Sequence, residues 1–161
     1  MSQPEEEALE VEDELKVIYA SRTHSQLSQF TTELRRVKFP PSIDPGPHDY
    51  ADSTIDDKKL SEQLRHLTLG SRKNLCINPN VKKLNSPTAI NERCLELQKP
   101  STPADCRCPF LPTKEDQHIV NDFRDTALAS ICDIEDLASV GKQLSICPYY
   151  ASRDAMKLSE V

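Results

Sequence analysis

LKVIYASRTHSQLSQFTTELRRV, residues 15–37, is the stretch that decides the fold, because it joins two different hydrophobic periodicities. Its first six residues, Leu15 to Ala20, include β-branched and aromatic side chains and are too few for a helix, so they predict a short strand. Residues 25–37 predict a helix, since the apolar residues recur on one face at Leu27, Phe30, Leu34 and Val37. A polar turn, residues 21–24, lies between them. This order is typical of an open α/β sheet, where ligands commonly bind beyond the carboxyl end of a strand.

The rest of the chain continues with a proline-rich segment and then helical patterns. Residues 39–59 hold four prolines and five aspartates, which predicts a flexible insertion with neither an interior strand nor a long helix. Residues 60–67 predict a short helix, and residues 67–69 look extended. Amphipathic spacing then predicts three longer helices, over residues 88–98, 114–131 and 133–144. Asp133, followed by Asp136, resembles a helix N-cap with an acid in the first turn.

The net charge of −6 over 161 residues is unevenly distributed. Residues 1–14 hold seven acids and no base, so the other 19 acids nearly balance all 20 basic residues. A block of like charge cannot bury apolar surface, and residues 1–14 therefore predict a disordered acidic leader. Residues 72–107 hold seven basic residues against three acidic ones, and this basic stretch coincides with the first four cysteines.

The composition excludes several classes of protein. No uncharged apolar run approaches the ~18 residues of a transmembrane helix, and the acidic amino terminus is unlike a signal peptide, so we expect a soluble, intracellular chain. With 37% hydrophobic residues there is material for one modest core, which does not favour a large self-sufficient enzyme. The phosphate-binding patterns G-x-x-x-x-G-K-[ST] and G-x-G-x-x-G are both missing from the sequence.

The six cysteines lack the close C-x-x-C pairs in which structural zinc ligands usually occur. Disulfides need an oxidising compartment, to which nothing in the sequence directs the chain. Four thiolates from separated loops can also hold an iron-sulfur cluster, and a cysteine can simply fill a core as a small apolar residue. Zinc, disulfide, cluster and core packing all remain open at this level.

Five motifs in register carry a resemblance to a known family. They are residues 17–27 (VIYASRTHSQL), 69–76 (LGSRKNLC), 91–94 (NERC), 108–110 (CPF) and 147–150 (CPYY). In order and spacing they resemble the XPD-type iron-sulfur helicases of superfamily 2, and most closely the ChlR branch of cohesion-linked, DEAH-box DNA helicases. The resemblance covers residues 15–156.

The resemblance implies an α/β fold: a partial RecA-like motor domain with an inserted, mainly helical iron-sulfur domain. Residues 15–38 would belong to the motor domain, residues 60–150 would form the cluster domain, and residues 151–161 would return towards the motor. Within this family, one 4Fe-4S cluster would be held by Cys76, Cys94, Cys108 and Cys147. Cys106 and Cys132 would be spare, although Cys106 lies one residue from Cys108 and could replace it if the loop shifted.

The resemblance also implies how nucleic acid is bound. The strand, turn and helix would form motif Ia, in which Ser21, Arg22 and Thr23 contact phosphates of single-stranded DNA. Basic side chains of the cluster domain would add phosphate attraction at a duplex fork, with Arg72 and Lys73 as first choices. Tyr149 and Tyr150 could stack on unpaired bases or pack against the cluster. No catalytic residue is expected, and His24 is expected to pack or donate a hydrogen bond.

The parent activity implied is ATP-dependent 5′ to 3′ DNA unwinding in the nucleus, in sister chromatid cohesion and DNA repair. ATP and magnesium would be bound by the parent only, because Walker A and D-E-A-H motifs do not occur here. We therefore expect a helicase fragment lying between those motifs, inactive alone. Its partners would be single-stranded and forked DNA, the rest of the helicase, and cohesion or replication-fork proteins, with no membrane. The alternative is a stand-alone protein-interaction module that binds zinc or no metal.

Overall fold

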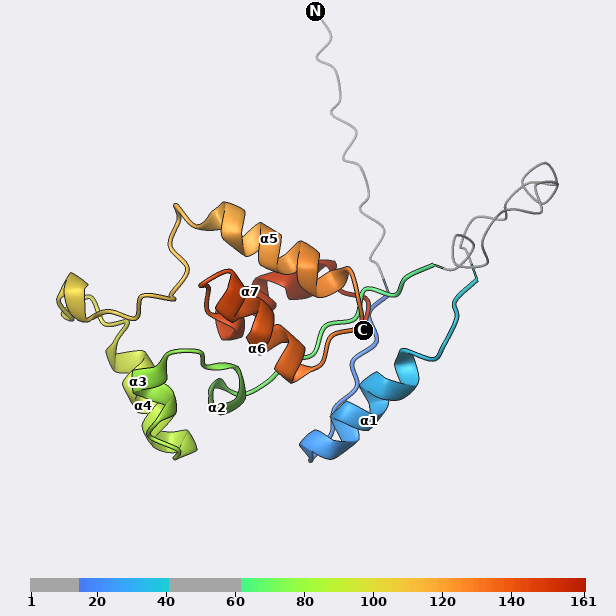
Figure 1. Cartoon of the computed structure of the whole chain (residues 1–161), viewed down its shortest axis with the longest axis horizontal. Coiled ribbons are helices and arrows are strands. Elements are labelled where there is room, and N and C mark those ends of the chain that lie inside the picture. The colour runs from blue at the N-terminus through green and yellow to red at the C-terminus, as the bar shows by residue number, and fades with distance from the viewer. Residues whose placement is uncertain (1–14, 41–61) are drawn as a thin grey trace, which may run out of the picture.

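The computed structural model describes residues 15–40 and 62–161, and these residues are mostly helical (Figure 1). The predicted leader, residues 1–14, and most of the predicted insertion, residues 39–59, lie outside the described residues. The elements, in chain order, are α1 (His24–Leu34), α2 (Arg72–Leu75), α3 (Pro79–Lys82), α4 (Pro87–Glu96), η2 (Ala104–Cys106), α5 (Gln117–Leu128), α6 (Ile134–Gln143), α7 (Pro148–Ala155) and η3 (Met156–Leu158). None of the helices in the described residues has the length and apolar character needed to cross a bilayer.

The main core lies where α5, α6 and α7 pack together (Figure 1). Phe123 of α5, Leu137 of α6 and Ala155 of α7 are fully buried there, and Leu75 of α2 reaches the same cluster. Each of these helices carries its apolar residues on one face, so the packing follows directly from the amphipathic spacing. The core thereby fixes α2, which ends at Cys76, and α7, which begins after Cys147.

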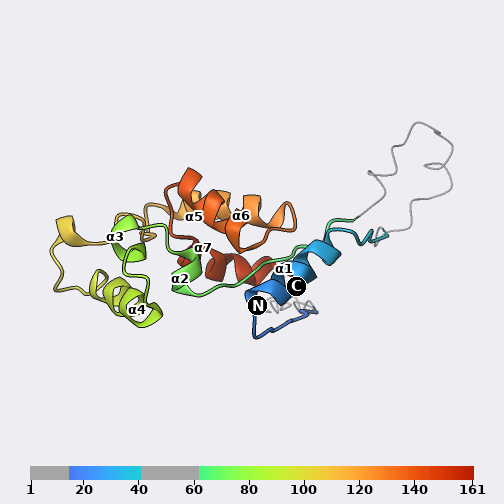
Figure 2. The ribbon, with the colours of Figure 1, turned by 60° about the horizontal axis from the view of Figure 1, so that its bottom comes forward.

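A second, smaller cluster forms between α3 and α4. Its buried residues are Val81, Ile90 and Leu97, and Cys76 and Cys108 pack against it. Figure 2 shows α3 and α4 at one end of the molecule and α1 at the other, with α5, α6 and α7 between them. The lobe formed by α3 and α4 therefore meets the helical core at the segments that carry cysteines.

Helix α6 begins as the sequence predicts. Asp133 is its N-cap: the side chain accepts from the backbone N–H of Asp136 at 2.9 Å, and the Asp136 carboxylate accepts from the N–H of Asp133 at 3.1 Å. This reciprocal pair satisfies two donors that would otherwise lack intrahelical partners. Three more of the predicted helices are present, as α1, α4 and α5, with bounds that differ by one to three residues from those predicted, while α7 was not predicted.

The predicted strand over residues 15–20 is not confirmed. The segment is extended, but the described residues contain no strand; the nearest feature is an isolated antiparallel bridge between Phe39 and Glu62. A strand requires a ladder of paired backbone groups, whereas the one backbone hydrogen bond that joins residues 15–20 to other described residues runs from the Val17 N–H to the Glu160 carbonyl at 2.8 Å. Ile18 is 91% exposed. The RecA-like part of the predicted fold class is thus not confirmed: residues 15–20 form no strand, and only the predicted helix that follows them is present, as α1.

The short helix predicted over residues 60–67 is wrong for its described part, residues 62–67, which is not helical. The N–H of Arg65 donates to the Glu160 carboxylate at 2.8 Å, and the N–H of Leu67 donates to the Val161 carbonyl at 2.7 Å. These bonds draw the backbone towards the carboxy-terminal residues and replace the local bonds of a helix. Backbone partners so distant in sequence can override the helical preference of a short segment, and the local pattern of apolar residues does not reveal them.

Candidate metal centre

Four cysteines reach the junction of the two lobes from four separate elements. Cys76 ends α2, Cys94 lies in α4, Cys108 follows η2, and Cys147 is the N-cap of α7. Burial raises the pKa of the Cys76 thiol, and the neighbouring thiols of Cys94 and Cys108 raise it further. Burial likewise raises the pKa of Cys147 to about 11, with added contributions from Cys108 and Cys76. Cys94 and Cys108 therefore lie near Cys76, and Cys76 and Cys108 lie near Cys147.

Cys147 is positioned by the carboxyl end of α6. Ser145, in the left-handed region with a φ of 54°, allows the N–H of Ile146 to return to the Gly141 carbonyl at 3.0 Å. Together with the bond from the Ser145 N–H to the Lys142 carbonyl, this is a Schellman ending. The next N–H, that of Cys147, donates to the Phe110 carbonyl at 2.8 Å. One turn thus ties Cys147 to the Cys108-Pro109-Phe110 segment.

Asn78 holds Cys76 and Cys108 near each other, although sequence reasoning did not single it out. Its side-chain oxygen caps α3 at the N–H of Asn80, which leaves the amide nitrogen free to donate to the Cys108 sulfur at 3.4 Å. The Cys76 sulfur lies 3.9 Å from the Asn78 carbonyl oxygen. Asn78 is only 6% exposed. Asn78 followed by Pro79 is a sequence pattern typical of a helix start, so the cap of α3 could have been predicted. The contact of Asn78 with Cys108 depends on tertiary structure and could not.

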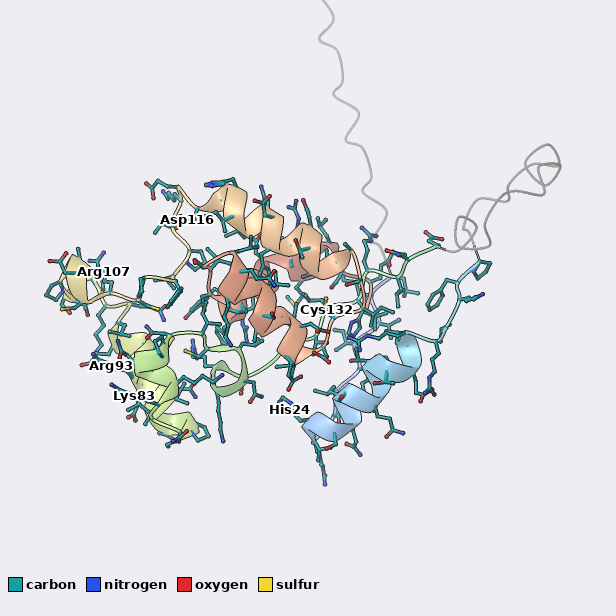
Figure 3. All side chains as sticks on the ribbon, viewed as in Figure 1. His24, Lys83, Arg93, Arg107, Asp116 and Cys132 are labelled. Atoms are coloured by element: carbon teal, nitrogen blue, oxygen red, sulfur yellow. The ribbon has the colours of Figure 1, made fainter. Side chains whose placement is uncertain are left out.

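The two remaining cysteines lie elsewhere. Cys106 is exposed in η2, whereas Cys132 is buried in the main core with its sulfur 3.4 Å from the Ser130 hydroxyl. Figure 3 labels Cys132 well away from the lobe that carries Lys83, Arg93 and Arg107. The prediction that Cys132 is a core residue agrees with this burial.

The chemistry of the junction suits a thiophilic group. Cys76, Cys94, Cys108 and Cys147 are all partly buried, and thiols are the donor type found in zinc and iron-sulfur sites. Among residues 15–40 and 62–161, no three His, Cys, Asp or Glu side chains are close enough to hold a single metal ion.

A stack of cationic and aromatic side chains lies beside the cysteines. The Arg72 guanidinium is 4.3 Å from the centre of the Tyr149 ring, and the Arg153 guanidinium is 3.4 Å from it. Arg72 also donates to the Tyr150 hydroxyl at 3.1 Å. Tyr149, predicted to stack on bases, therefore already stacks on two arginines, and Arg72 is half-buried while Lys73 is exposed. Arg153 was missed because its partner Tyr149 lies one helical turn away in a helix that was not predicted.

The turn predicted to bind phosphates is organised around the start of α1. Thr23 is the N-cap and accepts from the Gln26 N–H, while the Ser21 hydroxyl donates to the Gln26 side chain at 2.5 Å. Arg22 is exposed between them. A hydrogen bond between Asn74 and His24 joins this turn to α2, and Figure 3 labels His24. The structure thereby brings residues 21–24 and 72–74 together, although they are 50 positions apart.

Known proteins resemble the chain along nearly its whole length. A family model described as DEAD_2 matches residues 19–161. The ATP-dependent DNA helicase chl1 of Neosartorya fischeri is 57% identical over 157 residues, which cover 98% of this chain and 18% of that protein. The protein of the same name in Aspergillus clavatus is 53% identical over 98% of this chain and 21% of its own length. The Candida glabrata protein is 38% identical over 93% and 16%. The chain spans about a fifth of the length of these curated relatives.

Proposed function

Because the chain belongs to the DEAD_2 family, we propose that it supplies the iron-sulfur and single-strand-binding part of an ATP-dependent DNA helicase. The observation that carries this proposal is that Cys76 and Cys108 pack against one cluster and both contact Asn78, while the N–H of Cys147 donates to the Phe110 carbonyl, two residues after Cys108. Cys94 lies in α4, the helix that forms this cluster with α3. The similarity to relatives named ATP-dependent DNA helicase supports helicase activity in the whole protein.

The four cysteines would hold a 4Fe-4S cluster, which supplies a rigid covalent cross-link between the lobes when bound. Cys76 follows α2 and Cys147 precedes α7, two helices that reach the main core, whereas Cys94 lies in α4; Cys76 and Cys108 both pack against the α3–α4 cluster. Binding all four would fix the small lobe, whose own buried cluster is only three residues, against the core. The role is structural: the chain's residues position DNA without a redox turnover.

Single-stranded DNA would be held by the surface that joins the two polar segments. Ser21 and Thr23 present hydroxyls, and Arg22 a charge, at the amino end of α1, where the helix dipole favours phosphate. Lys73 lies in α2, and the hydrogen bond between Asn74 of α2 and His24 of α1 brings that helix next to this turn. Arg72 and Tyr149 would lie beside this path, and an unpaired base would stack on Tyr149 by displacing one of the two arginines that now lie over its ring.

At the level of the whole protein we propose 5′ to 3′ unwinding of forked DNA in the nucleus, in sister chromatid cohesion and DNA repair. ATP and magnesium would be bound by the rest of the helicase, which is also the nearest partner of this part. Cohesion and replication-fork proteins complete the proposed partners. The similarity to relatives named ATP-dependent DNA helicase supports this assignment.

Replacing Arg72 and Lys73 with alanine is expected to weaken binding of single-stranded DNA and to flatten its salt dependence. Each lost phosphate contact removes about one unit from the slope of log affinity against log salt. Fluorescence anisotropy with a labelled oligonucleotide, repeated over a salt series, measures both quantities. Lys73→Ala alone should lower the slope by about one unit, since its side chain is exposed.

Lys142→Ala is the matched control, because Lys142 is an exposed lysine in the last turn of α6. It should leave affinity and slope unchanged. Equal effects of Lys73→Ala and Lys142→Ala would show general charge attraction and would move the DNA path away from α2.

A further inference from the structure

We propose that Gln98 donates a hydrogen bond to the Cys94 sulfur that tunes the four-cysteine centre, and that Arg72 and Tyr150 fix its direction. The inference rests on the proposed function, since it concerns a side chain next to one of the proposed cluster ligands. No role for Gln98 was visible in the sequence motifs.

Gln98 is placed by the end of α4. It lies four residues after Cys94, and this spacing puts two side chains on the same helix face. Its amide nitrogen is 2.8 Å from the Cys94 carbonyl oxygen and 3.2 Å from the Cys94 sulfur. The first contact ends the helix, and the second brings an N–H to a proposed ligand atom.

The direction of this hydrogen bond follows from the groups behind it. A glutamine amide can be turned so that either its oxygen or its nitrogen faces the sulfur, and the network has to decide between them. The Tyr150 hydroxyl lies 2.9 Å from the Gln98 side-chain oxygen and accepts from Arg72 at 3.1 Å. A guanidinium can only donate, so the Tyr150 oxygen accepts from Arg72 and its proton is free for Gln98. The Cys94 carbonyl oxygen, 2.8 Å from the Gln98 nitrogen, can only accept, which turns that nitrogen towards Cys94. The Gln98 oxygen therefore accepts, and its N–H groups face Cys94.

The three side chains form a chain of donors that begins at a positive charge and ends at sulfur. Each bond polarises the next in the same sense, because every donor points towards Cys94. Arg72 is held at the start by stacking on Tyr149. The relay also joins the elements that carry three of the four cysteines, since Arg72 begins α2, Tyr150 is in α7 and Gln98 follows α4.

A donor beside a ligand sulfur has a predictable electronic effect. It favours the state with more negative charge on sulfur, so it raises the reduction potential of a bound cluster. Removal of the donor should lower that potential. A role in packing alone would change stability and leave the potential where it was.

The test uses the 161-residue chain, purified without oxygen and titrated with dithionite while the visible absorbance is followed. Gln98→Leu should raise the ratio of oxidised to reduced cluster at a fixed potential about tenfold. For one electron this corresponds to a fall of about 59 mV in the reduction potential. Tyr150→Phe, which keeps the ring and loses the hydroxyl, should shift it in the same direction by less. Gln143→Leu is the control, because Gln143 is exposed at the end of α6, and should cause no shift.

The outcomes separate this inference from the function on which it rests. A wild-type chain that binds no cluster overturns both. If the wild-type chain binds the cluster and Gln98→Leu has the same reduction potential as the wild type, the inference alone is overturned. If Gln98→Leu does not retain its cluster, Tyr150→Phe decides: a lowered potential supports the relay and an unchanged one overturns it. Loss of the cluster in both variants would mean that these residues hold the lobe rather than tune the site, which also overturns the inference.

Discussion

Replacing Cys94 with serine is expected to remove almost all iron and sulfide from the purified chain, whereas Cys132→Ser keeps both. Cys94 lies in α4 and is one of the two thiols that raise the pKa of the Cys76 thiol, while Cys132 belongs to the main core. A serine hydroxyl stays protonated where a thiolate is needed, so a cluster with one serine corner should be lost or severely weakened. Iron and acid-labile sulfide per chain, measured after anaerobic purification, give the result directly.

Cys106→Ser supplies a second control, because Cys106 is exposed and lies one residue from Cys108. It should retain the cluster as Cys132→Ser does. Equal iron content in Cys94→Ser and Cys132→Ser would overturn the ligand assignment, and loss of iron in Cys106→Ser with retention in Cys108→Ser would exchange those two residues.

Replacing Gly141 with alanine is expected to destabilise the chain by about 2–3 kcal/mol, the usual cost of overpacking. In an open helix the same change is favourable by ~1 kcal/mol. Here a new Cβ would lie 2.2 Å from the Pro148 Cγ and 2.9 Å from the Ile146 carbonyl oxygen. Both residues flank Cys147, so relief of the clash must move a proposed ligand. Urea unfolding measures the stability, and iron content measures the ligand displacement.

Gly70→Ala is the matched control for Gly141→Ala. Its new Cβ would meet the Leu75 side chain at 3.2 Å, which can give way by a few tenths of an ångström. We expect a cost below about 1 kcal/mol and full iron content. If the two alanine variants unfold at the same urea concentration, the close packing of Pro148 on α6 does not set the position of Cys147.

The sequence predicted the elements whose signals are local. The Asp133 and Asp136 pair marked the start of α6 because both partners of the capping box lie within one turn. Amphipathic spacing located α1, α4 and α5, since a buried helix face repeats every three or four residues.

Features that depend on distant partners could not be predicted. Residues 15–20 have the composition of a strand, but strand formation needs neighbouring backbone, and one bond to Glu160 does not make a ladder. In the same way the motifs suggested four ligand cysteines, yet the residues that orient them, Asn78 and Gln98, were missed. The contact of Asn78 with Cys108 spans 30 residues and that of Gln98 with Tyr150 spans 52, and no short sequence pattern encodes such pairs. The spacing of Cys94 and Gln98 by four residues was readable as a shared helix face, but not the direction of their hydrogen bond.

The most direct test of the central claim is the metal content of the wild-type chain. After purification without oxygen, it should be brown and contain about four iron and four sulfide per chain. A colourless chain with one zinc or no metal would contradict the account and would favour the stand-alone interaction module.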